Sequence, residues 1–160
     1  MQKYRALAGF LLLVFAISGI SSLITMPAVQ GWYTTINKPQ WTPPDWVFGP
    51  VWTTLYIMIA FSGWRVWRAI PSDYVSFKLR APVLRAYWLQ LLLNFLWTPA
   101  FFGLQSPVSG AIVITLLLAV ILWNITAFDK ADKPASWLLI PYALWVSYAL
   151  SLNHAIVRLN

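Results

Sequence analysis

The chain has 160 residues, of which 60% are hydrophobic and only 9% are charged. A soluble domain carries about 25% charged residues, so this chain has too few polar groups to cover a globule in water, and we favour a membrane protein over a soluble helical one. The net charge of +7 arises at the ends of apolar runs, which indicates membrane topology rather than nucleic-acid binding. With no cysteine and one histidine, disulfides and thiolate metal sites are excluded and a Ser-His-Asp triad is disfavoured.

Five apolar stretches follow along the chain, each close to the ~20 residues that cross a bilayer as a helix. None shows the alternation of polar and apolar residues that is typical of a transmembrane β-barrel. The sequence therefore predicts an all-α fold in one domain, residues 1–160: an integral membrane bundle of five transmembrane helices. The predicted spans are 6–25, 45–67, 84–103, 108–128 and 135–157, and the segments 70–76 and 129–134 are predicted to be simple connecting loops.

The first span is predicted to end before Pro27. Lys3 and Arg5 precede it, as basic residues precede the apolar part of a signal peptide. The apolar stretch is longer than such a segment, and no Ala-x-Ala site follows it cleanly, so we interpret it as a retained span.

The connector after the first span is unusually aromatic. Between Trp32 and Tyr56 four tryptophans, two tyrosines and four prolines fall within 25 residues. Prolines stiffen the backbone and aromatic rings offer large apolar faces, so the connector is predicted to be a preformed lid or wall over a site for a flat apolar ligand. Thr42 is the predicted N-cap of the second helix, with Pro43 at its first position and Asp45 three residues after the cap.

Prolines also fall inside three predicted spans and are expected to kink or loosen them there. These are Pro50, Pro99 and Pro141. In contrast, no carboxylate falls in the middle of a span, which argues against proton-coupled transport and against acid/base catalysis. The acids of the chain are Asp45, Asp73, Asp129 and Asp132.

Basic residues predict the orientation, because cytoplasmic loops carry the excess of Lys and Arg. Five crossings place nine of the eleven basic residues on one face and only Lys38 and Arg158 on the other. The N-terminus is therefore predicted in the cytoplasm, and the aromatic connector and the C-terminus outside it. The nine residues are Lys3, Arg5, Arg65, Arg68, Lys78, Arg80, Arg85, Lys130 and Lys133.

Aromatic and amide residues recur at helical spacing in three spans. The stripes are Trp52 and Tyr56; Gln90, Asn94, Trp97 and Phe101; and Leu138, Tyr142, Trp145, Ala149 and Asn153. Two interpretations stay open from spacing alone. The stripes either line a shared cavity for a small molecule, or they pack the helices together while other tryptophans anchor the interface.

Three polar residues lie near the predicted outer end. His154 is an interfacial polar residue or an axial ligand to a haem iron. Lys38 and Arg158 pair with carboxylates of a ligand or extend to lipid headgroups.

Several separated, unusual motifs follow one another along the chain. They are Trp32-Tyr33, Asn37-Lys38-Pro39, Trp41-x-Pro43-Pro44-x-Trp46, Val51-Trp52-x-x-Leu55-Tyr56, Asn94-x-x-Trp97-x-Pro99-x-Phe101-Phe102-Gly103, Pro141-Tyr142-x-x-Trp145 and Leu152-Asn153. Together these motifs resemble the signature of the TspO/MBR family, the tryptophan-rich sensory or translocator proteins, also called peripheral benzodiazepine receptors. The resemblance covers nearly the whole chain.

The resemblance implies a five-helix bundle, usually a homodimer, with one ligand cavity per subunit closed by the first connector. It implies tetrapyrrole ligands such as protoporphyrin IX and haem, cholesterol in mitochondrial members, and benzodiazepine-type drugs, with no obligatory cofactor. The matching pocket positions are Tyr33, Pro43, Trp52, Asn94, Phe101, Trp145 and Ala149, with Tyr56, Trp97 and Tyr142 as further candidates. Light-dependent degradation of porphyrin, if present, would involve Trp52 and Trp145.

Two departures from the family pattern matter. His154 stands where the sterol motif of mitochondrial members has Tyr, although Arg158 is retained, so sterol binding there is in doubt. Bulky residues replace the small residues through which bacterial relatives dimerise on the third helix. The best stripe of small residues is instead Ala143, Ser147 and Ser151 on the fifth helix.

The sequence thus predicts a multi-pass receptor or sensor, in a bacterial cell membrane, that binds tetrapyrroles in a tryptophan-lined cavity. Its partners are the lipophilic ligand, the bilayer and a second copy of the chain, and no nucleic acid. The alternatives are a transporter of porphyrins or similar lipophiles and a light-dependent porphyrin-degrading enzyme.

Overall fold

A computed structural model describes residues 2–70 and 74–160, with the side chains of residues 4–70 and 83–160. These residues form helices joined by turns, with no strand in the described part of the chain, so the predicted all-α fold is confirmed. In chain order the elements are α1 (Gln2–Gln30), α2 (Trp32–Thr35), α3 (Asp45–Ala69), α4 (Tyr74–Thr98), the π-helix η1 (Pro99–Gly103), α5 (Pro107–Asp129), α6 (Lys133–Trp137) and α7 (Ile140–Leu159).

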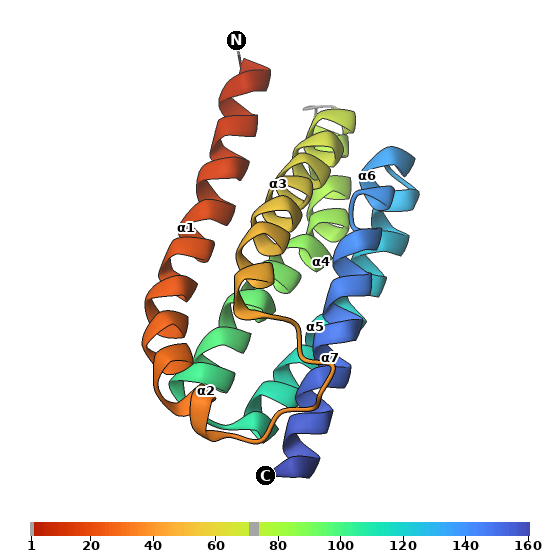
Figure 1. Ribbon diagram of the computed structural model, residues 1–160. Coiled ribbons are helices and arrows are strands. Elements are labelled where there is room, and N and C mark those ends of the chain that lie inside the picture. The colour runs from red at the N-terminus through yellow and green to blue at the C-terminus, as the bar shows by residue number, and fades with distance from the viewer. Residues whose placement is uncertain (1, 71–73) are drawn as a thin grey trace.

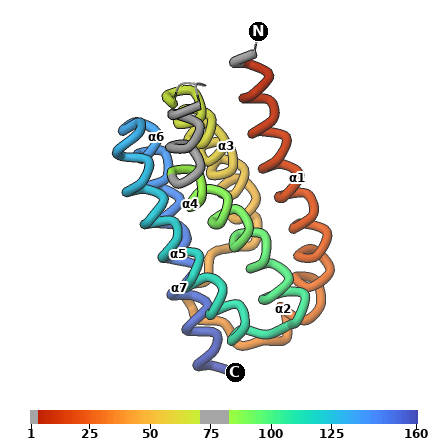
Figure 2. The backbone as a smooth tube through the Cα atoms, turned by 180° about the vertical axis from the view of Figure 1, so that it is seen from behind, coloured from red at the N-terminus to blue at the C-terminus, as the bar shows by residue number. Residues whose placement is uncertain are grey.

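The long helices run roughly side by side as one bundle (Figures 1 and 2). α1 packs along α3, α4 along α5, and α5 along α7. α1 begins at one end of the bundle and α7 ends at the other (Figure 1). The connector between α2 and α3 crosses the end at which α7 finishes and then runs back beside α7 to the start of α3.

Four helical stretches of the described chain are long and apolar enough to cross a membrane, and the protein is a multi-pass integral membrane protein. They are Tyr4–Gln30, Asp45–Ala69, Pro107–Asp129 and Lys133–Leu159. The remaining predicted span, the third in chain order, falls on α4 and η1. A fifth crossing by this segment stays a prediction. Of the basic residues behind the predicted orientation, Lys3, Lys78 and Arg80 have side chains outside the described set.

Both ends of the first connector differ from the prediction. α1 continues through Pro27 to Gln30 instead of ending before the proline. A proline deprives a helix of only one backbone donor, which membrane helices tolerate. At the other end, α3 begins at Asp45, so Pro44 is its N-cap and Thr42 is not. The Thr42 hydroxyl instead donates to the Pro39 carbonyl at 2.7 Å.

The third helix begins earlier than predicted and changes type at its end. Tyr74 already starts α4, so residues 74–76 are not a loop, while 71–73 lie outside the described residues. The helix passes into a π-helix at Pro99, where the Leu104 N–H donates to the Pro99 carbonyl at 2.8 Å, five residues back. The predicted loosening at this proline takes the form of a wider helical turn.

The fifth predicted span is two helices rather than one. α6 ends at Trp137 and α7 begins at Ile140, so Pro141 lies in the first turn of α7 and not inside a helix. A proline in the first turn leaves no helical hydrogen bond unmade, so no kink is required. The predicted loop 129–134 shortens to residues 130–132, and Asp132 caps α6 by accepting from the Ala135 N–H at 2.9 Å.

Tyr87 is the centre of the core at the end of the bundle away from the connector. Its ring is fully buried and stacks on Phe128 of α5, with 5.8 Å between the ring centroids. Gly63 of α3 lies directly against it, because a Cβ at this position would stand 2.4 Å from the Tyr87 ring. At the same end, Arg65 of α3 pairs with Asp132 at 3.0 Å and ties α3 to α6. The packed core thus leaves the opposite half of the bundle for a cavity.

Candidate functional site

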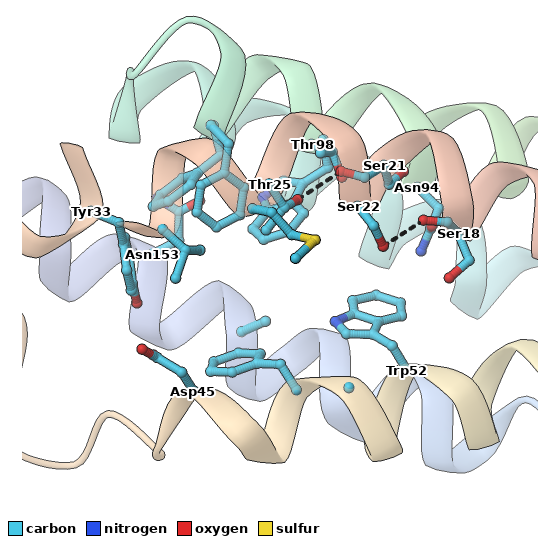
Figure 3. Close-up of a pocket in the computed structure, with 18 of the residues that line it drawn as sticks. Ser18, Ser21, Ser22, Thr25, Tyr33, Asp45, Trp52, Asn94, Thr98 and Asn153 are labelled. Carbon is cyan, nitrogen blue, oxygen red and sulfur yellow. Dashed lines mark hydrogen bonds between the residues drawn. The ribbon is translucent and has the colours of Figure 1, made fainter. Parts of the chain in front are cut away.

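A cavity of about 390 Å³ lies among α1, α2, α3, the junction of α4 with η1, and α7 (Figure 3). This volume falls within the roughly 300–1,000 Å³ typical of small-molecule sites. The lining residues are Ser18, Ser21, Ser22, Thr25, Met26, Val29, Tyr33, Asp45, Phe48, Gly49, Trp52, Thr53, Tyr56, Asn94, Trp97, Thr98, Phe101, Phe102, Ala149, Leu152, Asn153 and Ile156.

Aromatic rings form two walls of the cavity. Trp97 and Phe101 are stacked, with 5.5 Å between their centroids, and Phe102 packs edge-on against both. From α3, the indole of Trp52 lies 5.5 Å from the Tyr56 ring and projects into the cavity (Figure 3). Flat apolar faces on two sides suit a flat apolar ligand, because offset stacking and edge contacts are both open to it.

The inner end of the cavity is closed by a hydrogen-bonded network from three helices. The buried Asn94 of α4 accepts from the Tyr56 hydroxyl at 2.7 Å and donates to the Tyr142 hydroxyl at 2.9 Å. The amide thereby joins α3 and α7 to α4. This network orients the Asn94 amide, and Asn94 and Tyr56 both line the cavity.

A row of hydroxyl side chains on α1 forms the remaining wall. Ser22 donates to the Ser18 carbonyl and Thr25 to the Ser21 carbonyl, both at 2.9 Å (Figure 3). We did not predict these residues as part of the site. The available signal was the spacing of the hydroxyls at 0, +3, +4 and +7 in an otherwise apolar span, which places them on one helix face.

Tyr33 and Asp45 point toward one another at one end of the cavity (Figure 3). Burial, and then the charge of Asp45 and the proximity of Tyr148, raise the pKa of Tyr33 to about 12. The Tyr33 hydroxyl therefore stays a neutral hydrogen-bond donor at physiological pH. Asp45 is exposed, so the cavity is open at this end, which we call its mouth. The side of the cavity between α1 and α3 is open as well, since Ser22, Met26 and Thr53 of the lining are exposed.

The connector lies on α7 rather than directly over the cavity. Asn37 and Asn160 exchange hydrogen bonds of 3.0 Å, and the Tyr148 hydroxyl donates to the Trp41 carbonyl at 2.8 Å. Between α1 and α3, Tyr33 of α2 reaches the cavity lining. Asp45, the first residue of α3, lines the cavity as well.

Seven of the predicted site residues line the cavity: Tyr33, Trp52, Tyr56, Asn94, Trp97, Phe101 and Ala149. The sequence stripes on α3, α4 with η1, and α7 therefore converge. Residues of the lining that we did not predict to be site residues include Phe48, Thr98, Phe102 and Leu152. The predicted residues outside the lining are Lys38, Pro43, Tyr142, Trp145, His154 and Arg158.

The predicted site residues outside the lining lie behind it or on the surface of the protein. Tyr142 contacts Asn94, and the Trp145 ring lies 5.8 Å from that of Phe48, one layer behind the cavity. The Lys38 ammonium lies 4.5 Å from the centroid of the Tyr33 ring and donates to the Tyr33 carbonyl. His154 is exposed, with its Nδ1 3.0 Å from the Leu150 carbonyl oxygen. Its role as a haem ligand stays a prediction.

Within the described ranges, no three His, Cys, Asp or Glu side chains come together closely enough to hold an ion. The chemistry of the cavity is that of rings, hydroxyls, two amides and one carboxylate. It can bind a ligand by stacking and a few hydrogen bonds.

The fold and the cavity define a helical membrane protein with an internal site whose size and aromatic lining suit a small molecule. The profile of the TspO/MBR family matches residues 10–159, and the chain belongs to this family. The chain is 40% identical over 148 residues to the tryptophan-rich protein TspO of Chlorobaculum tepidum, covering 92% of this chain and 91% of the relative. It is 40% identical over 155 residues to the protein of the same name from Archaeoglobus fulgidus, with 96% of each covered. It is 34% identical over 130 residues to the human translocator protein, covering 81% and 75%.

Proposed function

We propose that the protein is a membrane receptor or sensor that binds a tetrapyrrole, such as protoporphyrin IX or haem, or a similar flat lipophile. The observation that carries this proposal is the convergence of aromatic residues from four elements on one cavity of about 390 Å³. This volume is near the lower end of the range for ligand sites. The ring system would therefore occupy the cavity while its substituents extend through the mouth.

Each wall has a role in this proposal. The macrocycle stacks on Trp97 and Phe101 on one side and on Trp52 on the other. Asn94 supplies polar contacts at the inner end, and the small Ala149 leaves room beside α7. Trp145 supports the lining from behind through its contact with Phe48, while Pro43 lies outside the lining.

The proposed membrane arrangement has five crossings, with α4 and η1 as the third. It is supported by the start of α1 and the end of α7 at opposite ends of the bundle, which an odd number of crossings requires (Figure 1). The basic side chains of Arg65, Arg68, Lys130 and Lys133 favour a cytoplasmic N-terminus and a C-terminus outside the cytoplasm. We also propose a homodimer, as the family resemblance implies, with the exposed Ser147 and Ser151 of α7 as candidates for its interface.

The two alternatives use the same cavity differently. A transporter would release the ligand on the other side, and vesicle uptake of protoporphyrin IX would reveal it. A light-dependent degrading enzyme would need an indole beside the ligand, and Trp52 has that position while Trp145 does not. Loss of porphyrin absorbance under light, abolished in Trp52→Phe, would identify the enzyme.

Titration of the purified protein with protoporphyrin IX tests the proposal. We expect saturable quenching of tryptophan fluorescence and a Kd about fivefold higher in Trp52→Leu, because loss of one ring contact costs about 1 kcal/mol. Trp137→Leu is the matched control, because Trp137 is 58% exposed and lies outside the lining. Quenching without saturation, or equal weakening in both variants, would contradict the proposal.

A further inference from the structure

Among the described residues, the exposed part of the cavity lining comes from two helices. The residues are Ser22 and Met26 of α1, and Asp45, Gly49 and Thr53 of α3. The lining residues that α2, α4, η1 and α7 contribute are buried or half-buried. The cavity is therefore open from the mouth along its side between α1 and α3, whereas the other elements close it.

The exposed lining residues of each helix form one row. Ser22 and Met26 are four residues apart, and the three residues of α3 follow at the same spacing, so each set lies along one helix face. α1 packs along α3 and runs in the opposite direction (Figure 1). The two rows are therefore the edges of one opening, which we call the α1–α3 slot. From Asp45 to Thr53 the slot extends about 12 Å along α3, since a helix rises about 1.5 Å per residue.

The slot faces the bilayer over most of its length. Its two rows belong to the membrane-spanning stretches Tyr4–Gln30 and Asp45–Ala69. Asp45 is the first residue of its span and lies at the interface, so Thr53, about 12 Å farther along the helix, lies within the hydrocarbon, which is about 30 Å thick. A ligand dissolved in the bilayer would therefore reach the cavity without passing through water.

The chemistry of the slot is compatible with contact with lipid. The Ser22 hydroxyl donates to the Ser18 carbonyl and the Thr53 hydroxyl to the Gly49 carbonyl, both at 2.9 Å. Hydroxyl groups that donate within their own helix need no water. Gly49 has no side chain, and a Cβ there would meet no atom within 4 Å, so the slot is unobstructed at this position.

The mouth itself is partly covered by α2 and the connector. Tyr33 is buried there, with 5.7 Å between its ring centroid and that of Phe102. The connector is held on α7 by the hydrogen bonds of Asn37 with Asn160 and by the bond that the Tyr148 hydroxyl donates to it. Entry from water along the bundle axis would require this cover to move, whereas the side is open in the structure.

We propose that the α1–α3 slot is the entrance of the cavity, through which a flat lipophile dissolved in the bilayer passes sideways, edge first. This proposal rests on the cavity of the proposed function and specifies the source and the path of its ligand. Charged substituents of the ligand stay at the interface, at the open end of the slot, while the ring moves between the two rows to the aromatic walls. This path suits a tetrapyrrole, because its carboxylates keep their water while its apolar ring never has to enter it.

Gly49→Phe places a ring in the slot, and Gly9→Phe is the matched control. Both glycines are exposed, and an added Cβ would meet no atom within 4 Å at either position. Gly9, however, lies in the first half of α1, outside the lining. The substitutions add no indole, so tryptophan fluorescence stays comparable among the variants.

Binding of two probes, protoporphyrin IX and the uncharged flat hydrocarbon pyrene, is followed by stopped-flow tryptophan quenching in lipid nanodiscs. We expect Gly49→Phe to slow association and dissociation by a similar factor of about ten, because a barrier on the path acts on both rates. Thr53→Phe, a second slot variant, should slow both rates as well. Gly9→Phe should keep the rates of the wild type.

A connector variant tests the competing route. Tyr148→Phe combined with Asn160→Ala removes hydrogen bonds that hold the connector on α7. If the ligand enters through the slot, association in this variant should equal that of the wild type. Entry beneath the connector would instead make association faster.

Unchanged association in both slot variants overturns the proposal even if the Kd rises, because the added ring would then fill the cavity without obstructing its entrance. Equal slowing in Gly9→Phe overturns it too, as does faster association in the connector variant. If only pyrene binds and the slot variants slow it, the tetrapyrrole proposal fails and the entrance stands. If protoporphyrin IX binds at rates that the slot variants leave unchanged, the tetrapyrrole proposal stands and the entrance fails. If neither probe binds, both proposals fail.

Discussion

At Gly110 the first turns of α5 lie directly against the cavity wall. A Cβ at this position would stand 2.5 Å from the Phe101 ring and 2.9 Å from the Asn153 amide oxygen. Phe101 belongs to the π-helix, and its ring stacks with Trp97. The lack of a side chain at Gly110 thus leaves the space that the Phe101 ring and the Asn153 amide occupy.

Gly110→Ala should destabilise the protein by about 1–3 kcal/mol, because the added methyl group overpacks a filled site. Gly19→Ala is the control, since a Cβ there meets no atom within 4 Å. This control should raise stability by up to about 1 kcal/mol through helix propensity. Thermal unfolding in detergent measures both, and a stabilised Gly110→Ala would show that the wall adapts to the added volume.

Among the elements, Asn94 connects three helices through one amide. α4 is joined to α3 by the bond from Tyr56 and to α7 by the bond to Tyr142, and all three side chains are buried. Asn124 of α5 is a contrasting case, because it is fully buried and neither of its side-chain polar atoms has a hydrogen-bond partner among the residues that the structure describes. The two amides are similarly buried, but only that of Asn94 forms hydrogen bonds among the described residues.

Asn94→Leu should lower stability by about 1–2 kcal/mol, because it leaves two buried hydroxyls without their partner. Asn124→Leu, the matched substitution, should be neutral or stabilising, because it removes an unsatisfied buried amide. Thermal unfolding of the two variants in the same detergent compares them directly. Equal losses of stability in the two variants would mean that the hydrogen bonds of Asn94 add nothing to stability beyond the packing of its side chain.

For the whole molecule, the proposed topology places the connector and the C-terminal end on one side of the membrane and the turn between α5 and α6 on the other. The chain has no cysteine, so single cysteines can be introduced without background. Gln40, Lys130 and Arg158 are exposed positions at these three places.

A membrane-impermeant maleimide applied to intact cells should label Gln40→Cys and Arg158→Cys, and should label Lys130→Cys only after permeabilisation. The reverse pattern would invert the orientation. Labelling of positions 40 and 158 from opposite sides would contradict the five crossings, because the chain between them would then cross an odd number of times.

Local chemistry was sufficient to predict the helical fold and the aromatic faces of three helices, whereas the family and the pocket positions were predicted from the resemblance of separated motifs. Apolar runs of membrane length predict helices because backbone groups in lipid must bond within their own segment. The 3.6-residue period places Asn94, Trp97 and Phe101 on one face, and all three line the cavity. Helix ends were predicted less well at Pro27, Thr42 and Pro141, since a proline or a hydroxyl fits several local conformations and neighbouring turns decide among them.

The tertiary structure alone decided which side chains of each stripe reach the hollow. Trp145 and Ala149 share a face of α7, yet Ala149 lines the cavity while Trp145 lies outside the lining, with its ring against that of Phe48 of α3. It also brought the hydroxyls of α1 and the carboxylate of Asp45 to a site predicted as aromatic. Periodicity in a sequence specifies the face of a helix, whereas the neighbour that the face meets depends on packing between segments far apart in the chain.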